Sequence, residues 1–188
     1  MLFVLIIYIF AINVVWGTSQ SLIKIGDPIP QFALYDQFNC SVTNKDLGGK
    51  IVIMNFIFTR CGAPTMCPAA TRKMEELQNL IKNQSLQNDV QFVTITFDPD
   101  NDTSKVLNQY AQGFNIDSSN YSFLTGDPEV IKRLTKQFGV FTVSEKGTIN
   151  HTMKTVIIDK TGMMVYETSK IDWQPRTLFS IIKKALQT

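Results

Sequence analysis

Residues 56–68 read Phe-Ile-Phe-Thr-Arg-Cys-Gly-Ala-Pro-Thr-Met-Cys-Pro and place two cysteines, Cys61 and Cys67, in one short stretch. The preceding residues 50–58 are apolar, β-branched and aromatic, which predicts a buried strand. The following residues 69–82 carry apolar side chains at helical spacing, which predicts a helix. A strand is therefore expected to lead through a loop with two thiols directly into a helix.

The second thiol lies where this helix is expected to begin. Pro68 suits the first helical position, because the N–H that proline lacks would have no partner there. Cys67 then meets the positive end of the helix dipole, which favours thiolate over thiol. Thiolate is the form that binds a metal or attacks a disulfide, so we expect the chemistry of the protein at this loop.

The rest of the chain alternates predicted strands and helices. Strands are expected over residues 31–35, 39–43, 89–97, 121–125, 155–158 and 163–167. Helices are expected after Thr103, after Asp127 and after Pro175. This order predicts an α/β fold, a three-layer sandwich of thioredoxin type. Its central mixed β-sheet is flanked by helices and carries an N-terminal hairpin extension.

Composition limits the classes of function. The 188 residues are 44% hydrophobic, which fits one globular domain with a core. The net charge of +2 comes from 18 basic and 16 acidic residues scattered along the chain, so no nucleic-acid partner is expected. The chain has 3 cysteines and 1 histidine, and their spacing does not fit a zinc finger, which would need all four.

The N-terminal residues indicate export. Residues 2–16 carry no charge, but they are short for a membrane span of about 20 residues and match the apolar core of a secretory signal. No Lys or Arg precedes them, and Trp16 is bulky beside the expected cleavage site, so an uncleaved anchor stays open. We expect a signal peptide or membrane anchor at 1–17, a tether at 18–25 and a thioredoxin-like domain at 26–188. The expected location is the bacterial periplasm, either soluble or anchored to the inner membrane.

The thiol pair allows several interpretations. Cys61 and Cys67 are separated by five residues, and a structural disulfide would gain little from closing so short a loop. Thiol redox chemistry and metal binding remain, together with a peroxidase activity suggested by the Thr-Arg-Cys sequence that ends at Cys61. Met66 adds a thioether beside Cys67; it is either a soft auxiliary ligand or a packing residue, and packing is favoured.

The single histidine favours metal binding. A lone histidine is usually a surface or hydrogen-bonded residue. His151, however, lies just before the predicted strand 155–158, after a loop rich in turn residues. In a thioredoxin-type sandwich that loop packs against the thiol loop. Two thiolates and one imidazole suit Cu(I), a soft ion that needs few ligands, and a neutral imidazole could also help to hold Cu(II).

Short motifs resemble those of one known family, in order and in spacing. They are Phe32-x-Leu34-x-Asp36, Asp46-Leu47-x-Gly49-Lys50, Phe58-Thr59-Arg60-Cys61, Cys67-Pro68, Phe97-Asp98-Pro99-x-x-Asp102-Thr103, Leu124-Thr125-Gly126, His151-Thr152 and Asp159-x-x-Gly162. Through them the chain resembles the SCO/SenC family of exported, thioredoxin-fold copper proteins over residues 26–186. The resemblance implies that Cys61, Cys67 and His151 match the family's copper ligands.

The resemblance also implies a function and a partner. The family delivers copper to the dinuclear copper centre of cytochrome c oxidase, or reduces the cysteines of that centre. The implied partner is an acceptor protein with a cysteine-containing copper site, such as a cytochrome c oxidase subunit. The family's thiols are usually separated by three residues, whereas five separate Cys61 from Cys67. The first hypothesis is a copper metallochaperone. The second is a thiol-disulfide oxidoreductase without metal, in which Cys61 attacks and Cys67 resolves.

Three further residues have two interpretations each. Cys40 is expected to be a small buried residue, with an exposed reactive thiol as the alternative. Asp98 follows a central strand at its carboxyl end, where it either supports the site or belongs to a turn before the next helix. Arg60 either favours the thiolate of Cys61 or is simply solvated.

Overall fold

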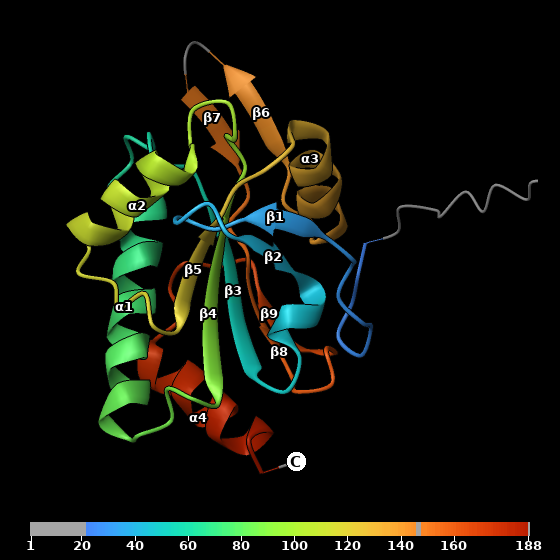
Figure 1. The fold of residues 1–188 in the computed structure, drawn as a ribbon, viewed down its shortest axis with the longest axis vertical. Coiled ribbons are helices and arrows are strands. Elements are labelled where there is room, and N and C mark those ends of the chain that lie inside the picture. The colour runs from blue at the N-terminus through green and yellow to red at the C-terminus, as the bar shows by residue number, and fades with distance from the viewer. Residues whose placement is uncertain (1–21, 146–147, 188) are drawn as a thin grey trace, which may run out of the picture.

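The computed structural model describes residues 22–145 and 148–187, and a mixed five-stranded sheet forms its centre (Figure 1). The strands are β1 (Ala33–Tyr35), β2 (Ser41–Thr43), β3 (Ile51–Ile57), β4 (Val90–Thr96), β5 (Tyr121–Leu124), β6 (Thr142–Glu145), β7 (Thr148–His151), β8 (Thr155–Ile158) and β9 (Met164–Thr168). The helices are α1 (Cys67–Asn83), α2 (Ser104–Gly113), α3 (Pro128–Gln137) and α4 (Pro175–Ala185), with a 3₁₀ turn, η1, over Asn44–Leu47. The predicted α/β fold is confirmed.

The central sheet has the strand order β5-β4-β3-β8-β9. Strands β3, β4 and β5 are parallel, whereas β8 and β9 run antiparallel to their neighbours. All seven residues of β3 are buried, because β3 is paired on both edges and covered on both faces. This explains why its sequence is apolar throughout rather than alternating.

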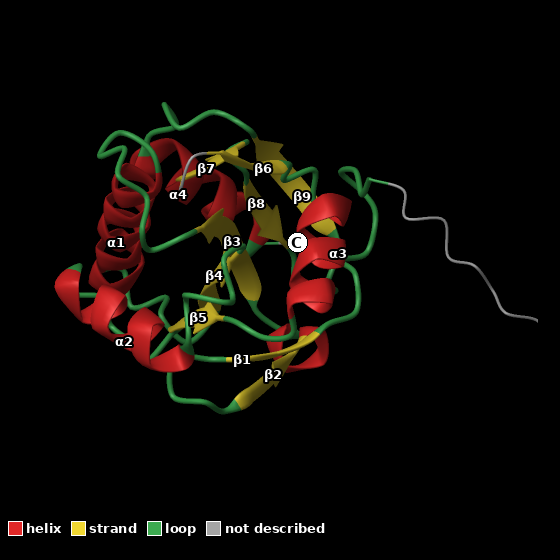
Figure 2. Ribbon diagram, turned by 90° about the horizontal axis from the view of Figure 1, so that it is seen from above, coloured by secondary structure: helices red, strands yellow, loops and turns green. Residues whose placement is uncertain are grey.

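Two hydrophobic cores lie on the two faces of this sheet. Ile53 and Ile57 of β3 join side chains of α1 and α4 in one core. Val52, Met54 and Phe56 alternate with them and join α3, β1 and β2 in the other core. Figure 2 shows the same layers, with α1 and α4 on one side of the sheet and α3 on the other.

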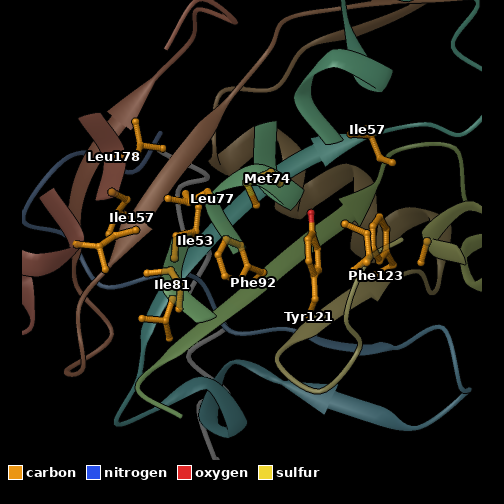
Figure 3. Close-up of a cluster of buried hydrophobic side chains, with 14 of the residues drawn as sticks. Ile53, Ile57, Met74, Leu77, Ile81, Phe92, Tyr121, Phe123, Ile157 and Leu178 are labelled. Carbon is orange, nitrogen blue, oxygen red and sulfur yellow. The ribbon is translucent and has the colours of Figure 1, made fainter. Parts of the chain in front are cut away.

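The amphipathic face of α1 supplies much of the first core. Met74, Leu77 and Ile81 are fully buried and lie over the sheet at helical spacing (Figure 3). They meet Ile53 and Phe92 of the two central strands. This contact fixes the position of α1 and therefore the position of its first residue, Cys67.

The helix starts are those expected from the sequence. The side chain of Thr103 accepts a hydrogen bond from the Val106 N–H and caps α2. Asp127 caps α3 by accepting from the Glu129 and Val130 N–H groups. Gly139 has a positive φ of 74° and follows the last turn of α3, a conformation that glycine adopts at little cost.

One region differs from the prediction. The segment before His151 is a β-hairpin rather than a loop, because β6 pairs antiparallel with β7 and Thr142 lies opposite His151. The turn residues of this segment belong to the hairpin, whose residues 146–147 lie outside the described part of the chain. The turn residues of this segment, among them Gly147 and Asn150, favour a loop when only the sequence is considered, and they hide the short strands on either side of the turn. The hairpin stands beyond one end of the central sheet (Figure 1).

The expected signal peptide or anchor at 1–17 lies outside the described residues. Near the start of the described residues, the Ile23 N–H donates to the Gln137 carbonyl. Gly26 follows, donating to the Met164 carbonyl of β9. Within residues 22–145 and 148–187, no helix is long and apolar enough to cross a membrane.

Candidate metal centre

Three side chains from three separate segments meet at one point. The Sγ atoms of Cys61 and Cys67 and a ring nitrogen of His151 all lie within 4.8 Å of one another. Within this group, Cys67 Sγ lies 3.5 Å from His151 Nε2. The structure thus brings together the three residues that the sequence selected as metal ligands.

The fold explains this convergence. Cys61 lies in the loop after the carboxyl end of β3, and Cys67 is the first residue of α1, which packs on that sheet. His151 is the last residue of β7, so the hairpin β6–β7 carries the imidazole to the same end of the sheet. Residues far apart in sequence are held together by strand pairing and helix packing.

Hydrogen bonding determines which nitrogen of His151 is available. Nδ1 lies 3.2 Å from the Thr152 carbonyl oxygen, which can only accept, so Nδ1 carries the hydrogen and donates it. Nε2 is then the atom with a lone pair, and it faces Cys67. The ring also packs against Phe58 and Phe97, at centroid distances of 5.7 and 4.7 Å. These contacts orient the imidazole before any ion binds.

Burial keeps the imidazole neutral. Desolvation is the larger effect and lowers the pKa of His151, while the hydrogen bond to the Thr152 carbonyl opposes it. A neutral imidazole is the form that coordinates a metal.

The prediction that the helix start favours a thiolate at Cys67 is wrong for the metal-free protein. Cys67 is fully buried, and burial raises the pKa of its thiol far above the ordinary value. The neighbouring Cys61 raises this pKa further. Removing the thiolate from water thus outweighs the favourable helix dipole. A metal ion could supply the missing positive charge, since a coordinating thiol loses its proton.

The other thiol is more accessible. Cys61 is half-buried and lines a cavity of about 230 Å³ together with Met66, Ile149 and His151. The Cys61 N–H points back to the Phe58 carbonyl at 3.4 Å, so the residue begins a tight turn out of the sheet. Both Cys61 and Cys67 are free thiols in this structure.

Two carboxylates hold the residues that precede Cys61. Asp102 is fully buried and accepts hydrogen bonds from the Thr59 N–H and from the hydroxyls of Thr59 and Thr96. Asp98 forms an ion pair with Arg60, at 2.9 Å between Nη2 and Oδ2. These contacts join the loop that carries Cys61 to the end of β4 and to the turn that follows β4. Asp98 agrees with both of its interpretations, because its carboxylate pairs with Arg60 and its carbonyl accepts from the Asn101 and Asp102 N–H groups in the turn before α2. Arg60 is paired with Asp98, although its side chain is 56% exposed.

In the sequence, Asp102 stands out only as a member of the motif Phe97-Asp98-Pro99-x-x-Asp102-Thr103. Asp102 lies in the segment between β4 and α2, which follows the carboxyl end of a central strand, where α/β folds place their sites. What the sequence does not show is that Thr59 lies opposite it, 43 positions away.

The prediction that Cys40 is buried is wrong. Cys40 is exposed, in the turn between β1 and β2. Its N–H donates to the Asp36 carboxylate, which closes the turn and leaves the side chain at the surface. Cys40 takes no part in the group formed by Cys61, Cys67 and His151.

The donor atoms indicate what the site can hold. Two sulfurs and one imidazole nitrogen are soft to borderline ligands, which suit Cu(I), Cu(II) or Zn²⁺ rather than Mg²⁺ or Ca²⁺. Among the described residues, this is the one group of three or more His, Cys, Asp or Glu side chains whose ligand atoms converge around two sulfurs. Cu(I) accepts such a small ligand set, whereas structural zinc sites usually have four ligands.

The fold is a thioredoxin-like sandwich, and two thiols and an imidazole converge at one end of its sheet. These features define a class of thiol proteins suited to binding soft metals or to redox chemistry. The sequence model described as SCO1/SenC matches residues 24–187. The chain belongs to the SCO1/SenC family.

Individual relatives agree with this assignment. The chain is similar to a SCO1 protein homolog of Bacillus subtilis, with 33% identity over 107 residues, which cover 55% of this chain and 53% of the relative. The match thus spans about half the length of that relative. The crystal structure of a SCO1/SenC family lipoprotein from Bacillus anthracis superposes with a TM-score of 0.79 and 30% identity, covering 88% of this chain and 99% of the other.

A relative with metal has also been solved. Arabidopsis thaliana ScoI with copper bound superposes with a TM-score of 0.73 and 26% identity. The superposition covers 88% of this chain and all of the other.

Proposed function

We propose that the chain is an exported copper metallochaperone. In this proposal, Cys61 and Cys67 as thiolates and Nε2 of His151 hold one copper ion. The single observation that carries it is the convergence of the three ligand atoms within 4.8 Å. The donor set, the neutral imidazole and the copper found in a solved relative support it.

The proposed cargo transfer proceeds by ligand exchange. An acceptor thiolate approaches from the cavity side, where Cys61 and His151 are accessible, while Cys67 remains buried. His151 is the ligand most easily displaced, because it is neutral and stands on a hairpin separate from the two thiols. The proposed acceptor is a copper protein with a cysteine-containing site, in the assembly of cytochrome c oxidase. Residues 1–17 would direct export or anchor the domain to the membrane.

Metal analysis of the reduced domain tests this proposal. One copper per chain is expected, with sulfur-to-copper charge-transfer bands when Cu(II) is bound. Replacing both cysteines by serine should abolish binding. His151→Ala should weaken Cu(II) binding far more than it lowers the unfolding temperature. A domain that binds zinc but no copper, or a His151→Ala variant with the parent's spectrum and affinity, would contradict the assignment.

A second function is a thiol-disulfide oxidoreductase. It is favoured by one observation, that Cys61 is accessible while Cys67 lies fully buried behind it. Cys61 would attack an acceptor disulfide, and Cys67 would then resolve the mixed disulfide. The protein would gain one disulfide and the acceptor two thiols. Reduction of an acceptor disulfide at the parent's rate by copper-free His151→Ala protein would support this function over copper delivery.

A further inference from the structure

The cavity beside the candidate metal centre contains one more sulfur. It is lined by Cys61 and His151 and also by Met66, whereas Cys67 is closed off beneath. Met66 thus lines the same cavity of about 230 Å³ as two of the three proposed ligands. The remaining lining residues are Phe58, Gly62, Ala63, Ile149 and Asn150, none of which carries a sulfur or an imidazole.

The backbone of Met66 is held firmly at this place. Its N–H donates to the Ala63 carbonyl at 3.0 Å, and its carbonyl accepts from the Ala70 N–H at 2.8 Å. Met66 is the residue directly before α1, and Cys67 is its neighbour. The position of its Cα is therefore determined by the same helix that positions Cys67.

Met66 also differs from the methionines that pack the interior. Met54, Met74 and Met164 are at most 1% exposed and belong to the two cores. Met66 is only half-buried and belongs to neither core. Packing, the interpretation favoured from sequence, thus does not account for its place on the cavity wall.

We propose that the Met66 thioether is an additional ligand that binds Cu(I) and not Cu(II). This inference rests on the proposed function. A thioether is a soft, neutral sulfur donor that selects Cu(I) and adds no negative charge to a site that already has two thiolates. Cu(II) relies instead on the imidazole nitrogen. Met66 and His151, which line the same cavity, would thus serve the two oxidation states differently.

Met66→Leu tests the proposal, because leucine conserves the volume but removes the sulfur. The expected result is a fall in Cu(I) affinity of about tenfold, measured by competition with a Cu(I) chelator, with Cu(II) affinity unchanged. Met163→Leu is the matched control, since Met163 is also half-buried but lies in the turn before β9, away from the cavity. It should leave both affinities at the parent values.

Selenium labelling gives a direct readout. In selenomethionine-labelled protein loaded with Cu(I), X-ray absorption at the selenium edge should detect one copper neighbour at bonding distance. The signal should persist in Met163→Leu and vanish in Met66→Leu. If the parent binds one Cu(I) but shows no selenium–copper contact, and Met66→Leu keeps its affinity, this inference is overturned while the proposed function stands. A parent that binds no copper overturns both.

Discussion

Asp102 shows how one buried side chain positions a thiol that it does not touch. Its carboxylate joins Thr59, two residues before Cys61, to Thr96 at the end of β4. Desolvation raises the pKa of Asp102 above its ordinary value. The three hydrogen bonds that the carboxylate accepts lower the pKa, but they do not cancel the effect of burial. A buried polar group whose hydrogen bonds are all formed makes its surroundings rigid, and here it holds Thr59 beside Thr96.

Asp102→Ala should lower the free energy of unfolding by about 2–4 kcal/mol, because it leaves a backbone N–H and two hydroxyls without their acceptor. Asp102→Asn should cost much less, since the amide keeps one acceptor oxygen and the hydroxyls can rotate. Urea titrations of both variants measure these values. Equal losses for Ala and Asn would contradict the role given to the hydrogen bonds.

The pH dependence of stability tests the charge on Asp102 separately. A carboxyl whose folded pKa is raised binds protons more strongly in the folded state, so its favourable contribution is complete below the unfolded pKa of about 3.9 and is lost as pH rises through the folded value. The parent should therefore gain stability relative to Asp102→Asn as pH falls from 7 towards 4. A constant difference across this range would show that the pKa of Asp102 is not raised.

Glycines stand at the ends of two helices, α2 and α3. Gly139 turns the chain from α3 towards β6 with a φ of +74°, whereas Gly113 ends α2 without a positive φ and has open space where a Cβ would stand. The two glycines thus differ in whether the conformation requires them.

Alanine at these two positions should have opposite effects. Gly139→Ala should destabilise the protein by about 1 kcal/mol, because a side chain is strained at positive φ. Gly113→Ala should stabilise it by about 0.5–1 kcal/mol, because it lowers the entropy of the unfolded chain in a helical position. Thermal unfolding of both variants measures the signs, and a loss of stability in both would contradict the distinction.

Across the folded domain, the candidate metal centre joins residues positioned by two different sheets. Cys61 lies in the loop after β3 and Cys67 begins α1, while His151 belongs to the hairpin β6–β7, which forms a two-stranded sheet of its own. An ion bound by all three would therefore add a link between the hairpin and the central body to the existing contacts of His151 with Phe58 and Phe97. Binding to the folded state alone adds stability in proportion to the logarithm of ligand concentration.

Adding Cu(I) to the reduced protein should raise its unfolding temperature. At a free concentration 100 times the Kd, the gain is about 2.7 kcal/mol, or roughly 5–10 °C for a domain of this size. A copper chelator should reverse the change. The variant with both cysteines replaced by serine is the control and should show no rise; an equal rise in that variant would place the stabilising copper elsewhere.

The sequence by itself determined the sheet, the helices and the three residues that meet. Apolar runs, helical spacing and capping residues such as Thr103 and Asp127 act over a few positions, so they can be read directly along the chain. The hairpin β6–β7 could not be predicted in this way, because its strands are short and the turn residues of the segment, among them Gly147 and Asn150, favour a loop.

Only the tertiary structure decided the environment of the site. The helix start alone indicates a thiolate at Cys67, but the layers packed around it bury the sulfur and raise its pKa. The position of Met66 on the cavity wall and the exposure of Cys40 are likewise seen only in the folded structure. The local sequence specifies which side chains a segment carries. The burial of a side chain depends on segments that are distant in sequence, because only the folded structure brings them close enough to exclude water from it.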